Sequence, residues 1–312
     1  MSLRSEVGRV ENSNSGMRLL ITKIIGGLGN QMFQYAAGRT LALTHGLSLR
    51  LDITGFDGYG LHQGFELQRV FCCDTALASA DEVRTVLGWR APAIMRRMLA
   101  RPELAALRGQ PFVVEPYFHY WSGLSNVPGQ AYIHGYWQSE KYFADAMTAI
   151  RTDFTFCQPM SPTNALIAEK IDTAGTAVSL HVRRGDYLKD VRTHAAHGVC
   201  SLDYYRTAVQ YVADRVEAPE FFVFSDDISW ARASLGLDYR CHFIDHNRGV
   251  ESYNDMRLMS LCRHHIIANS SFSWWGAWLN PSRDKMVIAP KRWFAKQDKN
   301  IGDLFPAGWT TV

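Results

Sequence analysis

The clearest fold signal in the chain is the stretch RLLITKIIGGLGNQMFQYAAGRTLALTHGLSLRL, which covers residues 18–51. Residues 18–25 are mostly apolar and stop at a glycine turn, as a buried strand does. Residues 30–45 then carry apolar side chains at helical spacing, and Gly46 is suited to end a helix. Residues 47–51 have the pattern of a second strand, so the stretch predicts a strand–helix–strand unit.

The second half of the chain repeats this alternation of strands and helices. We predict strands at residues 177–183, 221–224, 264–268 and 286–289, and helices at about 202–215 and 272–279. Such alternation is typical of doubly wound α/β units. The sequence therefore predicts an α/β protein with two Rossmann-like domains facing each other across a cleft.

Two prolines within residues 158–163 interrupt the pattern and mark the predicted domain boundary. The expected domains are residues 17–157 and 163–312, preceded by a polar, flexible leader at residues 1–16. In open α/β sheets, ligands bind beyond the carboxyl ends of the strands. We therefore expect the ligands of this protein to bind between the two domains.

The composition excludes several classes of protein. Of 312 residues, 47% are hydrophobic and 20% are charged, which is typical of a globular chain and not of a disordered or fibrous one. The net charge of only +3 does not indicate a nucleic-acid partner. No apolar run approaches the roughly 18 residues of a transmembrane helix, and the leader lacks the apolar stretch of a signal peptide. We expect a cytoplasmic protein without a transmembrane segment, whose six cysteines are reduced and show no metal-ligand spacing.

Residues 81–108 are predicted to be helical and are rich in arginine. The arginines are Arg90, Arg96, Arg97, Arg101 and Arg108. The favoured interpretation is a solvent-exposed helix face. The alternative is a weak docking surface for anionic lipid, which would make the protein peripheral at the cytoplasmic face of a membrane.

A glycine loop, GGLGNQ at residues 26–31, precedes the first predicted helix. Backbone amides at a helix N-terminus favour an anion, although a plain tight turn explains the glycines equally well. The loop is not a Walker motif, because no Gly-Lys-Ser/Thr follows, and its glycine spacing differs from the dinucleotide-binding fingerprint.

Two adjacent arginines follow the strand at residues 177–183, in the sequence HVRRGD (181–186). Buried cations need an anionic partner, and guanidinium groups match phosphate oxygens in geometry. Arg183 and Arg184 are therefore candidates for holding a pyrophosphate without a metal, with Asp186 fixing the arginine geometry. The alternative is a purely structural Arg–Asp pair at a domain interface.

A second polar loop begins the sequence NSSFSWWGAW at residues 269–278. Hydroxyls and amides at the start of a helix form a second candidate phosphate cradle, whereas simple N-capping also explains Ser270 and Ser271. We expect at least two of the three tryptophans to be core residues. The histidine pairs 264–265 and 194/197 lack a carboxylate or thiolate to complete a metal site, so we predict no bound metal.

Taken together, these loops resemble the bacterial α-1,2-fucosyltransferases. The resemblance is carried by GGLGNQMFQYA (26–36), HVRRGDY (181–187) and ANSSFSWWGAWL (268–279), and is supported by GYWQSEKYF (135–143) and HGVCSLDYY (197–205). It runs from about residue 17 to residue 294. The resemblance implies a GT-B-like fold and a GDP-β-L-fucose donor. It also implies transfer with inversion to the 2-hydroxyl of an acceptor oligosaccharide, usually at a terminal galactose, with no obligatory metal or other cofactor.

The resemblance also implies roles for individual residues. Arg183 would bind the β-phosphate and stabilise the leaving group, with His181 near the nucleotide and Arg184 in support. Asp255 stands sixteen residues before Ser271, and this separation implies guanine recognition by Asp255 and phosphate contact by Ser271. The other expected donor-binding residues are Gly27, Asn30, Ser270 and Phe272.

The acceptor hydroxyl needs a general base, and the family pattern does not assign one. By residue type and expected loop position, the candidates are Asp186, His62, Glu66 and His194. Three alternatives stay open at this stage. They are a fucosyltransferase with another acceptor or linkage, a non-catalytic module that binds a GDP-sugar, and an interaction scaffold that presents exposed tryptophans.

Overall fold

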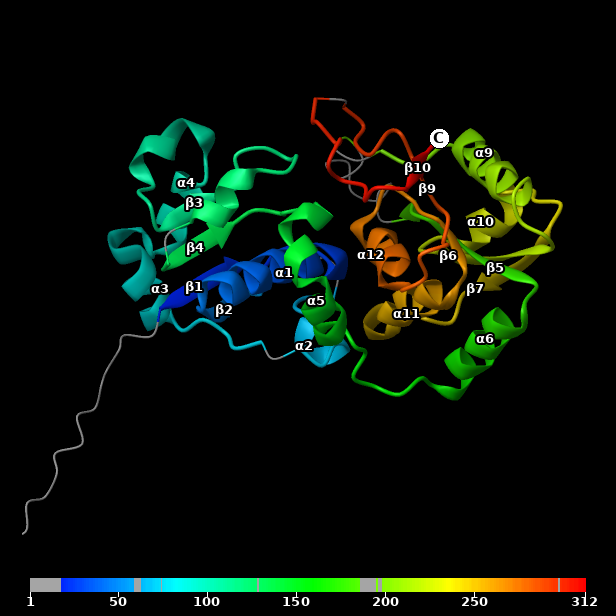
Figure 1. Cartoon of the computed structure of the whole chain (residues 1–312), viewed down its shortest axis with the longest axis horizontal. Coiled ribbons are helices and arrows are strands. Elements are labelled where there is room, and N and C mark those ends of the chain that lie inside the picture. Colours follow the sequence, from blue (N-terminus) through cyan, green and yellow to red (C-terminus); the bar gives the residue numbers. More distant parts are fainter. Residues whose placement is uncertain are drawn as a thin grey trace, which may run out of the picture.

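The computed structural model describes residues 18–58, 63–73, 75–127, 129–185, 195, 198–296 and 298–312. The chain forms two parallel sheets, each flanked by helices (Figure 1). One sheet belongs to the N-terminal half (up to residue 157) and the other to the C-terminal half (from residue 163). This arrangement confirms the predicted α/β fold class. The expected leader at residues 1–16 lies outside the described residues.

The N-terminal sheet has four strands in the order β2-β1-β4-β3. The strands are β1 (Leu19–Lys23), β2 (Ser48–Asp52), β3 (Phe112–Val114) and β4 (Ala131–His134). The central strand β1 pairs in parallel with both β2 and β4. Its first four residues are buried, as a strand covered on both faces requires.

The helix that connects β1 to β2 is α1 (Leu28–His45). It starts after Gly27 and ends at Gly46, which has the left-handed conformation (φ 61°) that terminates many helices. The predicted strand–helix–strand unit is therefore confirmed. The other helices of this half are α2 (Leu67–Val70), α3 (Ala80–Leu87), α4 (Ala93–Leu99) and α5 (Met147–Asp153).

The predicted helix over residues 81–108 is broken into α3, α4 and two 3-10 segments, Gly88–Arg90 and Pro102–Leu107. The expectation that all its arginines face solvent is wrong for Arg96, which is buried. Its guanidinium donates hydrogen bonds to the Asp52 carboxylate and to the Tyr132 hydroxyl. Burial of Arg96 is tolerated because a carboxylate compensates its charge inside the protein. Arg97 and Arg101 are exposed.

The C-terminal sheet has six strands in the order β10-β9-β8-β5-β6-β7. The strands are β5 (Thr176–Val182), β6 (Pro219–Ser225), β7 (Arg240–Ile244), β8 (His264–Ile266), β9 (Val287–Ala289) and β10 (Thr310–Thr311). Every residue of β5 is buried. The helices of this half are α6 (Pro162–Thr173), α9 (Leu202–Ala213), α10 (Ile228–Ser234), α11 (Tyr253–Leu261) and α12 (Ser271–Leu279).

An aromatic cluster around α12 joins the two halves. Trp274, Trp275 and Trp278 are all buried, and the first two lie within 5 Å of the Phe33 ring of α1 (4.5 and 4.9 Å between centroids). The Trp275 indole donates a hydrogen bond to the Gly29 carbonyl at 2.9 Å. The predicted core role of the tryptophans is confirmed for all three. The scaffold alternative, which needed exposed tryptophans, is wrong.

The last part of the chain returns to the N-terminal half. The Ser139 hydroxyl donates to the Asp303 carbonyl at 2.6 Å, and the Lys141 ammonium is paired with the Asp303 carboxylate. The C-terminal half therefore contacts the N-terminal half both through α12 and through this terminal segment.

Candidate active site

A cleft of about 890 Å³ lies between the two halves. Its walls are the loops after β1 and β4 on one side and the loops after β5, β6, β7 and β8 on the other. These loops follow the carboxyl ends of parallel strands, where ligands bind in open α/β sheets. Among the predicted site residues, Gly27, Asn30, Glu66, His181, Arg183, Asp255, Ser270, Ser271 and Phe272 line this cleft.

Helices α1 and α12 lie against each other (Figure 1), and the first residues of both line the cleft. The Asn30 carboxamide oxygen accepts hydrogen bonds from Ser271 Oγ at 2.9 Å and from Gln138 Nε2 at 2.7 Å. A Cβ added to Gly29 would lie 2.5 Å from the Ser271 carbonyl carbon, so only glycine permits this approach. The first turns of two helices therefore lie against each other and line the same cleft, and helix N-termini favour a bound anion.

Arg183 and His181 stand on the C-terminal side of the cleft, at the end of β5. The Arg183 guanidinium Nε is 3.5 Å from the Asp226 carboxylate. His181 is buried beside it, and burial together with the nearby arginine lowers the histidine pKa to about 3. The imidazole is therefore neutral at physiological pH, so Arg183 provides the positive charge at this point.

Asp226 and Asp227 have structural partners at the end of β6. Asp226 Oδ1 accepts the backbone amide of Arg184 at 2.9 Å, and Asp227 caps α10 by accepting the amide of Trp230 at 3.2 Å. The Arg184 guanidinium stacks over the Trp230 ring at 4.3 Å and does not line the cleft. The structure therefore separates the two arginines, and Asp226 fixes the loop that carries both.

Asp255 lies on α11 at the base of the cleft. One of its carboxylate oxygens accepts from Asn247 Nδ2 at 2.8 Å. Asn247 is in turn hydrogen-bonded to Asn164 at the start of α6, and the side-chain Nδ2 of Asn164 donates to Asn247 Oδ1 at 2.9 Å. Burial raises the Asp255 pKa to about 7, although the bond from Asn247 acts in the opposite direction.

Ser270 and Phe272 belong to the start of α12. The Ser270 hydroxyl accepts the Phe272 amide at 3.3 Å, which makes Ser270 the N-cap. The capping interpretation is therefore confirmed for Ser270 but not for Ser271, whose hydroxyl donates to Asn30. The Phe272 ring lies 5.9 Å from the His181 ring.

Glu66 is the one candidate base that can be placed, because His62, Asp186 and His194 lie outside the described residues. Its buried carboxylate accepts from the Arg69 guanidinium at 2.7 Å. Burial raises the Glu66 pKa, and the arginine opposes that shift.

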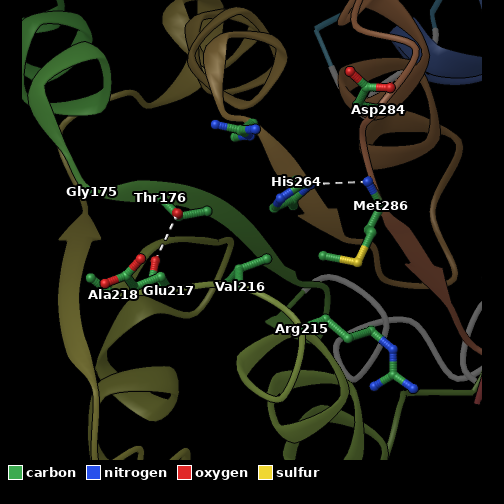
Figure 2. A pocket seen from close by; sticks show the side chains of 10 residues that line it. Gly175, Thr176, Arg215, Val216, Glu217, Ala218, His264, Asp284 and Met286 are labelled. Atoms are coloured by element: carbon green, nitrogen blue, oxygen red, sulfur yellow. Dashed lines mark hydrogen bonds between the residues drawn. The ribbon is translucent and has the colours of Figure 1, made fainter.

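The predicted histidine pair at the start of β8 is explained by hydrogen bonds within the fold. His265 is bonded to the Ser179 hydroxyl and to the Asn280 carboxamide, both at 2.9 Å. His264 Nδ1 accepts the Met286 amide at 3.0 Å (Figure 2). His194 and His197 lie outside the described residues.

A second pocket of about 630 Å³ lies at the opposite edge of the C-terminal sheet, where β5, β6 and β8 begin (Figure 2). It is formed by one half alone, and it contains none of the predicted site residues. In this pocket, the Thr176 hydroxyl donates a hydrogen bond to the Glu217 carbonyl at 2.8 Å. The cleft between the halves is therefore the candidate active site.

Sequence reasoning missed several residues of the cleft. Asn247 and Arg248 follow β7, a strand that was not predicted, whereas Tyr136 and Gln138 lie in the motif at residues 135–143 and had no assigned role. Glu115 follows β3, and its carboxylate accepts the backbone amides of Tyr136 and Trp137 at 2.7 and 3.0 Å. Burial raises its pKa to about 7.

The fold and the cleft between the two halves are those expected of a GT-B-like glycosyltransferase, and sequence comparison shows which family the chain belongs to. The profile of glycosyl transferase family 11 matches residues 112–312, so the chain is a member of that family. An α-1,2-colitosyltransferase of Escherichia coli is 35% identical over 301 residues, covering 95% of this chain and 99% of that protein.

Other relatives support the same placement. The O-antigen biosynthesis glycosyltransferase WbnK of Escherichia coli is 33% identical, over 88% of this chain and 95% of that protein. A galactoside α-(1,2)-fucosyltransferase 1 of Leontocebus fuscicollis is 27% identical over 47% of this chain and 42% of that protein. The fucosyltransferase NodZ from Bradyrhizobium shares the fold, with a TM-score of 0.55 at 15% identity over 85% of this chain and 93% of that one. The predicted family and the GT-B-like fold are confirmed.

Among the described residues, no helix has the length and apolar character needed to cross a membrane.

Proposed function

We propose that this protein is an inverting, metal-independent α-1,2-fucosyltransferase. It transfers L-fucose from GDP-β-L-fucose to the 2-hydroxyl of a galactose in a surface glycan, working in the cytoplasm or at the cytoplasmic face of a membrane. The observation that carries the proposal is the cleft, in which residues from two halves of the chain meet at the carboxyl ends of both sheets. Membership of glycosyl transferase family 11 supports the class of reaction.

In this proposal the diphosphate binds where α1 and α12 meet. Arg183 contacts the β-phosphate, and Asp226 holds its guanidinium in position. The amides of Gly27 and Ser271 supply further donors at the two helix N-termini. These fixed charges and dipoles stabilise the negative charge that develops on GDP as it leaves.

Asp255 recognises the guanine. One carboxylate oxygen is bonded to Asn247, which orients the group, and the carboxylate accepts from guanine N1–H and the exocyclic amine. Adenine presents no such pair of donors. The position of Asp255 at the base of the cleft, remote in sequence from Arg183, supports this role.

The acceptor 2-hydroxyl attacks the fucose C1 from the face opposite GDP. The bond between C1 and the β-phosphate oxygen breaks, its electron pair remains on GDP, and the hydroxyl proton passes to a base. We assign the base to Glu66, because its carboxylate lines the cleft on the N-terminal side and its pKa is raised by burial. Glu66→Gln should then lower kcat by at least about a hundredfold and leave GDP affinity unchanged.

A second candidate donor is GDP-colitose, which the 35% identity to the colitosyltransferase favours. Colitose is fucose without the 3-hydroxyl. A site that hydrogen-bonds a substrate hydroxyl rejects the analogue that lacks it by roughly 10⁴-fold or more, whereas a site shaped for the deoxy sugar rejects the added hydroxyl only by about 10²-fold.

The test is to measure kcat/KM for GDP-fucose and GDP-colitose with a galactoside acceptor such as lactose, and to determine the linkage of the product by NMR. A strong preference for GDP-fucose with an α-1,2 product supports the proposal. A preference for GDP-colitose assigns the second candidate. GDP release that is equal with and without acceptors across a glycan panel overturns the transferase assignment in favour of a GDP-sugar-binding module.

A further inference from the structure

Two exposed thiols from distant parts of the chain lie against each other on the N-terminal half. Cys72 and Cys157 are 85 residues apart in sequence, and their Sγ atoms are 2.7 Å apart, with the Cys157 thiol donating to the Cys72 sulfur. This separation is shorter than a van der Waals contact between sulfur atoms, so the two side chains point directly at each other. A disulfide needs this orientation, because cysteines whose Cβ vectors diverge cannot be joined without backbone movement.

The backbone holds both cysteines in place. Phe71 and Phe156 form an antiparallel bridge, in which the Cys72 amide donates to the Thr155 carbonyl at 2.9 Å and the Cys157 amide donates to the Val70 carbonyl at 3.0 Å. The two phenylalanine rings also pack together, with centroids 5.1 Å apart. The thiols are therefore brought together by backbone pairing of the two segments that carry them.

The surroundings favour this pair over other combinations of cysteines. Cys73 is adjacent in sequence, but it is buried, and burial raises its pKa to about 12, which makes it a poor nucleophile. Cys262 is also fully buried. Cys72 and Cys157 are the two exposed cysteines of the chain.

A bond between these cysteines would connect segments that contact both halves. Cys72 follows α2, whose Arg69 donates to the Val250 carbonyl and lies over the Tyr253 ring. Cys157 begins the connection to α6, where the Arg257 guanidinium donates to the Gln158 carbonyl at 2.7 Å. A disulfide would tie these two points of contact with the C-terminal half to each other.

We propose that Cys72 and Cys157 form a thiol–disulfide exchange site that reacts with small soluble disulfides, such as oxidised glutathione, and closes to an intramolecular disulfide. The proposal is independent of the glycosyltransferase assignment, since it involves no residue of the cleft.

The chemistry proceeds in two exchanges. The Cys72 thiolate attacks one sulfur of oxidised glutathione, forming a mixed disulfide and releasing one glutathione thiolate. The Cys157 sulfur, after losing its proton to solvent, attacks the Cys72 sulfur of the mixed disulfide and displaces the second glutathione. Two cysteine thiols are thereby oxidised, and one glutathione disulfide is reduced to two thiols.

The order of attack follows from the contact between the thiols. The Cys157 thiol donates a hydrogen bond to the Cys72 sulfur, and burial together with this bond raises the Cys157 pKa to about 11. We assign the first attack to Cys72, because it is the sulfur that accepts this hydrogen bond. Because thiolates are the reactive form, closure should be faster as the pH rises.

The experiment is to incubate the full-length protein with oxidised glutathione, block the remaining thiols, and map disulfides by peptide mass spectrometry. We expect a cross-linked peptide containing Cys72 and Cys157, a loss of two of the six free thiols, and a melting temperature raised by several degrees. Reduction by dithiothreitol should reverse all three. Absence of the cross-linked peptide after complete reaction would overturn the proposal.

Variants distinguish closure from general oxidation. Cys157→Ser should stop at a glutathione adduct on Cys72, and neither Cys157→Ser nor Cys72→Ser should show the rise in melting temperature. Cys241→Ser, in the half-buried part of β7, is the matched control and should behave as the unmodified chain. An equal rise in melting temperature in Cys72→Ser would also contradict the proposal.

Discussion

At the scale of single residues, contacts within the protein organise the C-terminal side of the cleft. Asp226 contacts the Arg183 guanidinium and accepts the Arg184 backbone amide, so one carboxylate fixes two consecutive residues. A preoriented guanidinium loses little conformational freedom when phosphate binds. Arg184 shares this loop but stacks on Trp230, outside the cleft.

Replacing Arg183 by alanine should therefore lower the affinity for GDP by about tenfold to several hundredfold, since charge-assisted hydrogen bonds contribute about 1.5–3 kcal/mol each. Arg183→Lys should retain part of the affinity, because an ammonium keeps the charge but not the paired geometry. Isothermal titration calorimetry measures both, with Arg97→Ala as an exposed control. Wild-type affinity in Arg183→Ala would remove this residue from the diphosphate site.

Asp255 should set the choice of nucleotide base. Asp255→Ala should weaken GDP binding and lower the ratio of GDP affinity to ADP affinity, because the site loses its acceptors for the guanine donors. Asp255→Asn, which keeps the size but loses the charge, should fall between alanine and the wild type. Titrating GDP and ADP against the three proteins measures the ratio. If Asp255 only supported the fold, stability would fall while the ratio stayed constant.

The raised pKa of Asp255 also predicts a dependence of GDP binding on pH. Burial raises the pKa of its carboxyl to about 7, and the proposed contact with guanine requires the ionised form. GDP affinity should therefore fall as the pH drops below 7, approaching tenfold per pH unit. The β-phosphate of GDP also titrates, so the measured quantity is the difference between the wild type and Asp255→Asn. Parallel pH profiles for the two proteins would contradict this prediction.

Asp255 should also make the nucleotide-free protein less stable at high pH. The folded-state pKa lies above the unfolded value, so its contribution to stability is full at low pH and is lost as the pH rises through 7. Asp255→Asn should accordingly melt at a higher temperature than the wild type at pH 8 without nucleotide, and the difference should shrink at pH 5. This loss of stability with rising pH is opposite in sign to the change expected for a carboxylate in a stabilising ion pair.

At the scale of elements, the sequence is sufficient for those whose signal is local. The apolar run of β1, the glycines around α1 and the buried runs of β5 and β6 are all readable without neighbours. In contrast, β3 has three residues and β4 has four, and each is a strand because of pairing with the sheet. Such short segments carry too few residues for periodicity to be recognised.

The same limit applies to the site. Arg183, Asn30 and Ser271 were found because they lie in motifs directly after predicted strands. Asn164 and Asn247 could not be found, since their role comes from contacts across 83 residues of sequence. Arg96 was misplaced for the same reason, because its partner Asp52 lies 44 residues away.

The close approach of α1 and α12 can be tested at Gly29. A Cβ there would lie 2.5 Å from the Ser271 carbonyl carbon and 2.7 Å from the Phe272 amide nitrogen, both of which are backbone atoms. The helices must separate to admit it, so Gly29→Ala should lower both the melting temperature and the GDP affinity. Intrinsic helix propensity would favour alanine by about 1 kcal/mol and cannot explain a loss.

Gly276→Ala is the matched control, because a Cβ there meets side-chain atoms of Met259 within the same half, Cβ at 3.0 Å and Sδ at 3.1 Å, and its nearest backbone contact is 3.7 Å away. We expect a small effect in that variant. Equal losses in the two variants, measured by thermal melting with and without GDP, would show that the contact between α1 and α12 has no special role.

At the scale of the whole molecule, the two halves contribute complementary parts of one site. The N-terminal half provides the α1 N-terminus, Asn30 and Glu66, and the C-terminal half provides Arg183, Asp255 and the α12 N-terminus. The bond from Ser271 to Asn30 and the buried tryptophans of α12 hold these parts together. A packed and hydrogen-bonded contact between the halves therefore supports the place where the diphosphate is proposed to bind.

The proposed diphosphate site, to which both halves contribute, predicts that catalysis does not need a metal ion. The diphosphate charge is met by Arg183 and by two helix N-termini from different halves, so activity with GDP-fucose should change less than about twofold in EDTA. The rival reading is a Mg²⁺ or Mn²⁺ site at Asp226 and Asp227, although the former contacts Arg183 and the latter caps α10. Two variants distinguish these interpretations in the presence of EDTA. Asp226→Asn should weaken GDP binding, because it releases the Arg183 guanidinium. Asp227→Asn should bind GDP as the wild type does, because asparagine can still cap the helix. Complete loss of activity in EDTA that Mg²⁺ or Mn²⁺ restores, together with equal losses in both variants, would instead place the leaving-group charge on a metal.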